Sequence, residues 1–212
     1  EKIDHDAIDR AVAILADARE FHALTDGAFD PTIQPLWRLY ADHFQRGGGE
    51  EGPVPAALAA ARARAGLDAV RANPDRVVFG RPGMALTLNG IAQGWITDRV
   101  TDRLRAAGVT STLVDMGEIR GLGGPWQVGI DGTDAVVPLK DRAIATSSPR
   151  GFAFDPAGRY THIIDPRTGA TPSRHARITV TAPTAAAADA LSTGAALMDR
   201  APDLPGVTVQ HH

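Results

Sequence analysis

The sequence predicts an α+β fold in which mixed, largely antiparallel sheets pack against helices. The expected elements run in the order helix, helix, strands, helix, strands, helix, without the regular strand–helix alternation of a doubly wound sheet. The chain has 212 residues, and 43% of them are hydrophobic, a share typical of globular proteins. We therefore expect a single domain over residues 1–210, followed by the remnant of a purification tag at His211 and His212.

Apolar spacing and capping residues predict four helices. Their expected ranges are 4–25, 55–66, 91–107 and 184–198. Asp4 is suited to cap the first helix and Thr184 the last, because a short side-chain oxygen accepts a hydrogen bond from an otherwise unpaired backbone N–H. Gly66 is expected to end the second helix, since glycine readily adopts the left-handed conformation that often follows a helix.

Short apolar runs between turn residues predict the strands. Their expected ranges are 77–79, 84–88, 111–114, 127–130, 143–146, 160–164 and 177–181. Residues 26–31, which contain an Asp-Gly and an Asp-Pro pair, are expected to form a turn, and the glycine-rich residues 47–52 a loop.

Composition excludes several classes of function. The chain has no cysteine, which rules out disulfides, thiolate nucleophiles and cysteine-bound zinc or iron–sulfur sites. The formal net charge is −3, with both signs mixed along the chain, which argues against a nucleic-acid partner. No apolar run approaches the roughly 20 residues that a membrane-spanning helix needs, so we do not expect an integral membrane protein.

The predicted helix over 184–198 carries the side chains best suited to a metal ion. Asp189 and Thr193 are four residues apart and share one face of that helix. A carboxylate beside a hydroxyl offers the hard oxygen ligands that Mg²⁺ prefers, and carbonyls, water or phosphate would complete the coordination shell. The alternative is a polar stripe facing solvent, against which the apolar neighbours of Asp189 argue.

Two turns that contain glycine are candidates for ligand binding. In residues 27–32, Phe29 and Asp30 are presented together, either as a ligand clamp or with Phe29 packed in the core. In residues 88–95 a predicted strand leads into a turn and a helix start, whose free N–H groups favour phosphate. A plain helix start is the alternative for the second turn.

Hydroxyl and imidazole groups mark two further segments. The predicted strand that begins at Ala143 ends in the hydroxyls of residues 146–148, which either bond a ligand or cap a turn. His162 can exchange a proton near neutral pH, although a single histidine on a strand is more often structural.

Read in order, these segments resemble the ApbE family of flavin transferases. The matching strings are GAFDPTIQPLW, LNGIAQGWITD, AIATSS, THIIDPRTGATP and TVTAPTAAAADALSTGAALM, which together span nearly the whole chain. The resemblance implies an ApbE-like fold. It also implies the Mg²⁺-dependent transfer of FMN from FAD to a threonine or serine hydroxyl of an acceptor protein, with release of AMP.

The resemblance also assigns roles to individual residues. As metal ligands it implies the side chains of Asp189 and Thr193 and the backbone carbonyls of Gly90 and Ala186. At the flavin nucleotide it places Ala28, Phe29, Asp30, Thr87, Gln93 and His162. The catalytic candidates are therefore Asp189, Thr193 and His162. His162 is the expected base for the acceptor hydroxyl, and Asp165 the group expected to orient it.

Some positions depart from the family pattern. Gln93 stands where a lysine or glutamate is common, and Thr87 where an aspartate is usual. Residues 115–118 replace a more glycine-rich turn. The family also has an N-terminal segment with flavin contacts, which we expect this chain to lack.

The LNGIAQG string and the Met-Gly-Glu-Ile turn are similar to the branch of the family linked to nitrous oxide reductase maturation. Members of that branch are exported to the periplasm and flavinylate a membrane-bound electron-transfer protein. We therefore expect a periplasmic protein with such an acceptor, its export signal lying outside the given chain.

Two other functions stay open at this point. A Mg²⁺-dependent FAD pyrophosphatase would use water as the nucleophile and release FMN and AMP. A non-catalytic FAD-binding maturation factor would fit the altered residues Thr87 and Gln93.

Overall fold

The computed structural model describes residues 5–172 and 175–212. Contacts within the chain divide it into two compact units. Unit 1 consists of Glu1–Leu88 with Pro149–Ser173, and unit 2 of Asn89–Ser148 with Arg174–His212. The expectation of one domain over residues 1–210 stays a prediction.

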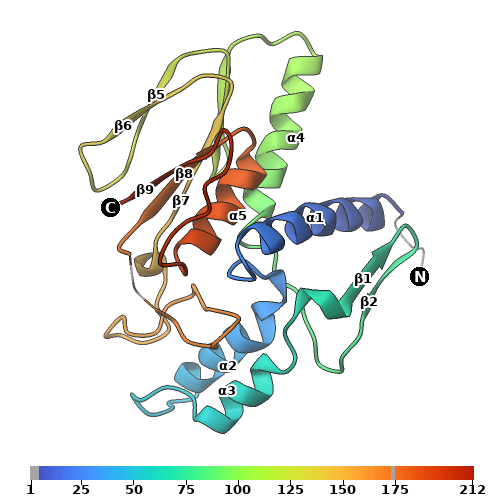
Figure 1. Cartoon of the computed structure of the whole chain (residues 1–212), viewed down its shortest axis with the longest axis vertical. Helices are drawn as coiled ribbons and strands as arrows, with labels where there is room; N and C mark the ends of the chain where they lie inside the picture. Colours follow the sequence, from blue (N-terminus) through green and yellow to red (C-terminus); the bar gives the residue numbers. More distant parts are fainter. Residues whose placement is uncertain (1–4, 173–174) are drawn as a thin grey trace. The chain divides into compact units, whose positions relative to one another are not determined.

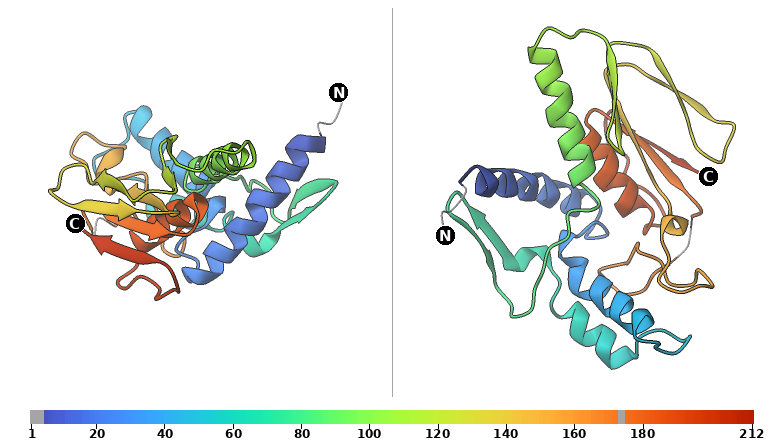
Figure 2. Two further views of the ribbon diagram at one scale, coloured as in Figure 1. Left: turned by 90° about the horizontal axis from the view of Figure 1, so that it is seen from above. Right: turned by 180° about the vertical axis from the view of Figure 1, so that it is seen from behind.

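Unit 1 is built from helices and one hairpin (Figure 1). Its elements are α1 (His5–Leu24), the 3₁₀ turn η1 (Pro31–Ile33), α2 (Gln34–Gln45), α3 (Pro55–Arg62), η2 (Leu67–Ala69), β1 (Val70–Asn73), β2 (Arg76–Phe79) and η3 (Pro149–Gly151). Strands β1 and β2 pair antiparallel. Helices α2 and α3 lie side by side in Figures 1 and 2.

In the core of unit 1, the irregular segment after η3 packs against α2. Leu36 and Tyr40 of α2 are buried together with Ala61 of α3 and Ile164 of that segment. The Tyr40 hydroxyl donates a hydrogen bond to the carbonyl of Gly169 at 2.8 Å, which satisfies the polar end of a buried aromatic side chain. The segment that carries His162 is therefore anchored to α2 by residues that follow His162.

Unit 2 is centred on a five-stranded antiparallel sheet. Its strands, in spatial order, are β3 (Thr112–Asp115), β4 (Ile119–Leu122), β7 (Ala143–Ser147), β8 (Ile178–Ala182) and β9 (Thr208–His211). A separate hairpin pairs β5 (Trp126–Gly129) with β6 (Val136–Leu139). Helix α5 (Ala185–Ala195) packs on β7 and β8, and α4 (Ala92–Ala106) packs on α5 (Figures 1 and 2).

Gly94 allows α4 and α5 to approach each other closely. A Cβ atom at this position would collide with the backbone carbonyl of Ala185 at the start of α5. The small residue is therefore explained by helix packing, and a substitution with any side chain would push the two helices apart.

The predicted fold class and most helices are confirmed. Every strand pairing among residues 5–172 and 175–212 is antiparallel. Helices α1, α4 and α5 fall within a few residues of the expected ranges, and the Thr184 side chain accepts a hydrogen bond from the N–H of Ala187 at 3.2 Å, as an N-cap does. The proposed cap Asp4 lies outside the described residues.

Two predicted strands are wrong. Residues 84–88 pair with no other strand. The N–H of Thr87 instead donates a hydrogen bond to the carbonyl of Pro31 at 2.8 Å. Residues 160–164 contain only an isolated bridge, between Thr161 and Ala153. In both segments apolar side chains are buried without a partner strand, so apolar content alone misled the prediction.

Other elements were not predicted. Helix α2 and strands β1, β4, β6 and β9 were missed, and α3 ends at Arg62, before the expected Gly66. His211, expected in a tag remnant, lies in β9 opposite Ile178. Short strands with few alternating residues give weak sequence signals, which explains these omissions.

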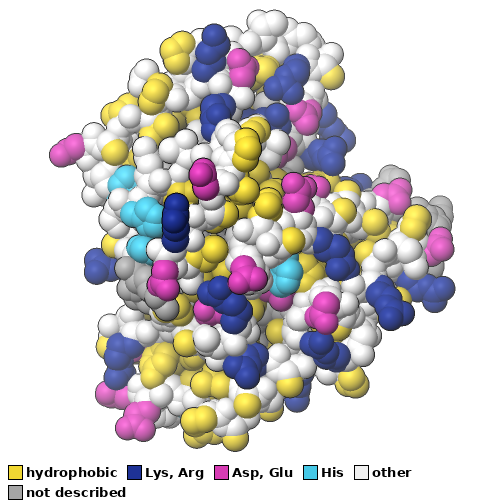
Figure 3. Space-filling model, viewed as in Figure 1, with side chains coloured by type: hydrophobic (Ala, Val, Ile, Leu, Met, Phe, Trp, Pro, Cys, Tyr) yellow, Lys and Arg dark blue, Asp and Glu magenta, His cyan; other side chains and the backbone are white. Residues whose placement is uncertain are grey.

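Charged side chains do not segregate on the face shown in Figure 3, where basic and acidic groups are interspersed. This agrees with the mixed charge pattern of the sequence. None of the helices in the described part of the chain is both long and apolar enough to cross a membrane.

Candidate functional site

Helix α5 carries the two predicted side-chain ligands of a metal ion. Asp189 is 4% exposed, and its carboxylate accepts a hydrogen bond from the backbone N–H of Gly94 at 3.1 Å. Thr193 lies one turn further along the helix and is half-buried. The solvent-facing alternative for Asp189 is therefore excluded, since this carboxylate is buried against the first turn of α4.

A cluster of hydroxyls surrounds Thr193. The Oγ of Ser147, at the end of β7, lies 2.7 Å from the Oγ of Ser192 and 3.3 Å from the Oγ1 of Thr193. Ser192 also donates to the carbonyl of Asp189 at 2.9 Å. The hydroxyl at the end of the predicted strand 143–146 therefore meets the predicted metal ligand, a contact between residues 46 positions apart.

A buried ion pair fixes the start of α5. Asp98 of α4 accepts the N–H groups of Ala185 and Ala186 at 2.8 and 2.9 Å and pairs with Arg120 of β4 at 2.7 Å. The side chains of Asp98 and Arg120 are only 12% and 11% exposed. Asp98 therefore satisfies helix N–H groups that would otherwise lack partners, and it holds α5 against α4. Sequence reasoning missed this role, although Asp98 stands inside the LNGIAQGWITD string.

Glu118 is a second acidic residue near Asp189. It lies in the turn between β3 and β4 and is half-buried. Burial, together with the charges of Asp189 and Asp115, raises the pKa of Glu118 to about 9. Burial likewise raises the pKa of Asp189 to about 7, although the Gly94 hydrogen bond acts in the opposite direction. Burial is the main cause of both pKa shifts, and no basic side chain among the described residues offsets it.

The remaining predicted residues of unit 2 lie on the two helix starts. Gly90 is in the turn that precedes α4, and Ala186 is buried in the first turn of α5. Gln93 is exposed in the first turn of α4, with its amide against the backbone of Gly117. Gly94 and Asp98 of α4 bind Asp189 and the first turn of α5. The structure therefore brings the predicted metal-binding segments together.

The donor set of unit 2 fits a hard divalent cation. It consists of oxygen atoms only, from a buried carboxylate and a hydroxyl of α5, and Asp189 has no basic side chain beside it among the described residues. No group of three or more His, Cys, Asp or Glu residues suited to a metal occurs in residues 5–172 and 175–212. Carbonyls, water or a phosphate would therefore have to supply the remaining ligands of a magnesium ion.

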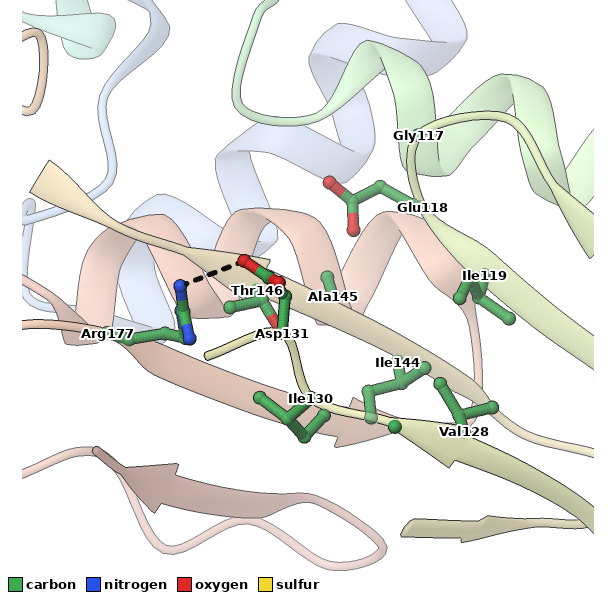
Figure 4. Close-up of a pocket in the computed structure, with 11 residues that line it drawn as sticks. Gly117, Glu118, Ile119, Val128, Ile130, Asp131, Ile144, Ala145, Thr146 and Arg177 are labelled. Atoms are coloured by element: carbon green, nitrogen blue, oxygen red, sulfur yellow. Dashed lines mark hydrogen bonds and ion pairs between the residues drawn. The ribbon is translucent and has the colours of Figure 1, made fainter. Parts of the chain in front are cut away.

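A pocket of about 190 Å³ lies within unit 2, and Glu118 and Thr146 are among the residues that line it. Its floor is apolar and includes Val128, Ile130 and Ile144 (Figure 4). Arg177 and Asp131 form an ion pair at 3.4 Å on the rim of this pocket. Glu118 lines another part of the pocket, apart from this pair.

In unit 1, His162 is held by a backbone carbonyl. Its Nδ1 lies 3.0 Å from the carbonyl oxygen of Phe152, and its own N–H donates to the same carbonyl at 3.1 Å. A carbonyl only accepts, so Nδ1 carries the proton and Nε2 keeps its lone pair in the neutral ring.

The expected orienting role of Asp165 is not supported. Its carboxylate accepts two hydrogen bonds from the guanidinium of Arg167 and one from the backbone N–H of the same residue, each at 2.9 Å. The partner of Nδ1 of His162 is the Phe152 carbonyl, so sequence proximity to Asp165 was misleading.

The turn with Ala28, Phe29 and Asp30 has a clear structural role. Ala28 and Phe29 are buried, and Asp30 caps η1 by accepting from the N–H and the hydroxyl of Thr32 at 2.7 and 2.6 Å. Within unit 1, Phe29 is therefore packed in the core, which was the alternative to a ligand clamp. The hydrogen bond between Thr87 and Pro31 brings Thr87 to the same turn.

A second pocket, of about 250 Å³, lies next to this turn within unit 1. Asp30 lines it together with three basic side chains, those of His22, Arg62 and Arg167. The structure thus groups Ala28, Asp30 and Thr87 in unit 1, whereas the predicted contact Gln93 belongs to unit 2.

Comparison with known proteins identifies relatives along nearly the whole chain. The model of the ApbE family matches residues 3–205. A protein named FAD:protein FMN transferase from Haemophilus influenzae is 32% identical over 201 residues, covering 85% of this chain and 58% of the relative. A protein of the same name from Vibrio cholerae is 31% identical and covers 89% of this chain and 61% of the relative.

Solved structures show the same fold. The apo form of the flavinyl transferase ApbE from Pseudomonas stutzeri is 32% identical, with a TM-score of 0.72, covering 88% of this chain and 62% of that one. The ApbE protein from Thermotoga maritima is 30% identical, with a TM-score of 0.77, covering 93% and 67%. The chain spans about three fifths of the length of the two relatives from Haemophilus and Vibrio.

Proposed function

The chain belongs to the ApbE family, and we propose that it transfers FMN from FAD to a threonine or serine hydroxyl of an acceptor protein, releasing AMP. The observation that carries the proposal is the buried Asp189 carboxylate, one turn from the Thr193 hydroxyl and without a basic partner among the described residues. Relatives that cover most of this chain are named for this activity.

The reaction breaks one bond and forms another. The acceptor hydroxyl oxygen attacks the FMN phosphorus of the FAD pyrophosphate, the bond to the AMP phosphate breaks, and the hydroxyl proton passes to a base. A magnesium ion held by Asp189 and Thr193, with the carbonyls of Gly90 and Ala186, would neutralise charge on the phosphate oxygens. Asp98 supports this arrangement because it fixes the first turn of α5 against α4.

His162 is the proposed base for the acceptor hydroxyl. The Phe152 carbonyl occupies Nδ1, so the ring presents an unprotonated Nε2 that can accept a proton. The basic side chains of His22, Arg62 and Arg167 beside Asp30 support binding of an anionic nucleotide in unit 1. The roles of Phe29, Thr87 and Gln93 in contacting FAD belong to the same proposal.

We further propose that the protein works in the periplasm and modifies a membrane-bound electron-transfer protein during nitrous oxide reductase maturation. The support is the similarity of the LNGIAQG string and the Met-Gly-Glu-Ile turn to that branch of the family. The acceptor would present a threonine or serine hydroxyl from its surface.

Intact mass spectrometry tests the proposed transfer. Peptides containing threonine or serine are incubated with the protein, FAD and Mg²⁺, with EDTA in a parallel reaction. We expect a metal-dependent gain of one FMN on the peptide and one AMP for each FMN transferred.

Two other outcomes would replace this proposal. Release of AMP and FMN at the same rate without a peptide would establish a pyrophosphatase. Bound but intact FAD, with no AMP, would establish a flavin-binding maturation factor.

A further inference from the structure

We propose that Glu118 is a second carboxylate ligand of the divalent cation that Asp189 holds. This inference rests on the proposed metal-dependent function and adds a residue to its site. The motif comparison assigned no role to Glu118, and three independent features of unit 2 point to it.

The first feature is the backbone position of Glu118. The hydroxyl of Thr97 donates to the carbonyl of Gln93 at 2.8 Å and also lies 3.3 Å from the carbonyl of Glu118. Gly117, with φ of +99°, passes so close to the Gln93 amide that a Cβ atom would collide with it. The turn that carries Glu118 is therefore fixed on the first two turns of α4.

The second feature is that the same part of α4 holds Asp189. The N–H of Gly94, the residue after Gln93, donates to the Asp189 carboxylate. The backbone of Glu118 and the carboxylate of Asp189 are thus both held by the first two turns of α4, at Thr97 and Gly94. The electrostatic effect of Asp189 on Glu118 follows from this arrangement.

The third feature is the lack of a compensating cation. No basic side chain pairs with Glu118 or Asp189 among the described residues of the chain. Arg120 is engaged by Asp98 and Asp102, and Arg177 by Asp131, which lies apart from Glu118 in Figure 4. The negative charge of Asp189 disfavours the ionised form of Glu118, and a divalent ion bound by both carboxylates would remove this cost.

A competing explanation is that Glu118 stays protonated and serves only the turn between β3 and β4. The two explanations differ in metal affinity. If Glu118 is a ligand, Glu118→Gln removes a negative oxygen donor while keeping the shape of the side chain. If Glu118 serves only the turn, the amide can replace the protonated carboxyl without changing the affinity for metal.

The test is a titration with Mn²⁺, a magnesium substitute whose free form is counted by electron paramagnetic resonance. The wild-type protein, Glu118→Gln and Asp189→Asn are titrated alone and with saturating FAD. Asp134→Asn, in the exposed loop between β5 and β6, is the control for the loss of one negative charge. Circular dichroism verifies that each variant is folded.

We expect Glu118→Gln to weaken Mn²⁺ binding by roughly tenfold or more, Asp189→Asn to weaken it further, and Asp134→Asn to bind as the wild type does. Wild-type affinity in Glu118→Gln together with loss of binding in Asp189→Asn would overturn the role of Glu118 and leave the proposed site intact. Absence of bound Mn²⁺ in the wild type, with and without FAD, would overturn both.

Discussion

Helix α5 and the segment around His162 are stabilised in opposite ways. The side chains at the start of α5 depend on partners far away in sequence: Gly94 is 95 residues from Asp189, and Asp98 is 87 residues from Ala185. In the segment after η3 the carboxylate and imidazole side chains bind nearby groups, although Ile164 and Gly169 also contact α2. Asp165 binds Arg167 two residues away, and His162 binds Phe152 ten residues away.

This difference predicts how each region responds to mutation. A change at the start of α5 removes contacts between separate elements, so it should affect the stability of unit 2 as well as metal binding. A change in the segment around His162 should act locally and leave most of unit 1 folded.

The largest expected effect is on the metal site. Asp189→Asn should reduce FMN transfer by about 10³-fold, because the bound cation contributes several kcal/mol to phosphoryl transfer. Initial rates of peptide flavinylation measure the loss, with Asp134→Asn as the charge-matched control. Unchanged transfer in Asp189→Asn would remove α5 from the active site.

His162→Gln should reduce transfer by roughly 10²–10⁴-fold if Nε2 accepts the proton of the acceptor hydroxyl. The unfolding temperature of the variant should change little, because the His162 ring is held by a nearby carbonyl, that of Phe152. His43→Gln on α2 of the same unit serves as the control. Transfer at the wild-type rate in His162→Gln would contradict the role of His162 as base.

Asp98→Asn should destabilise the protein by about 3 kcal/mol, because the buried Arg120 would keep only the half-exposed Asp102 as a charged partner. Urea unfolding measures the loss. Asp102→Asn is a matched control on the same helix, since Asp102 also contacts Arg120, at 3.3 Å, but is 49% exposed and should cost less than about 1 kcal/mol. Equal losses in the two variants would show that α5 does not depend on the buried pair.

The smallest effect is expected at Asp155, in the local region. Burial alone would raise the pKa of Asp155, but hydrogen bonds from the N–H of Tyr160 and the guanidinium of Arg159 outweigh it and lower the pKa. A lowered folded-state pKa means that this stabilisation is complete above about pH 4 and is lost as the pH falls through the folded-state value.

Asp155→Asn should therefore lower the unfolding temperature at pH 7 by a few degrees, roughly, and the difference from wild type should shrink below about pH 4. Thermal unfolding followed by circular dichroism between about pH 3 and pH 7 checks this. The range brackets the ordinary pKa of an aspartate side chain. A constant difference across this range would show that the charge of Asp155 does not contribute.

Several features of the fold and site were predictable from sequence. Helical spacing placed Asp189 and Thr193 on one face of α5, and Thr184 caps the helix as expected. The predicted strands at 160–164 and 84–88 failed because burial of apolar residues does not require a ladder. Short strands such as β4 and β9 carry too few alternating residues to be recognised.

The sequence by itself determined the α+β class, the family and the oxygen ligands of α5, because these depend on residue type and on spacing within one element. Only the tertiary structure decided that Gly94, Asp98, Ser147 and Glu118 contribute to the surroundings of α5. Those contacts join residues from four separate parts of unit 2. No local pattern encodes such contacts, since they form only when the sheet and both helices pack together.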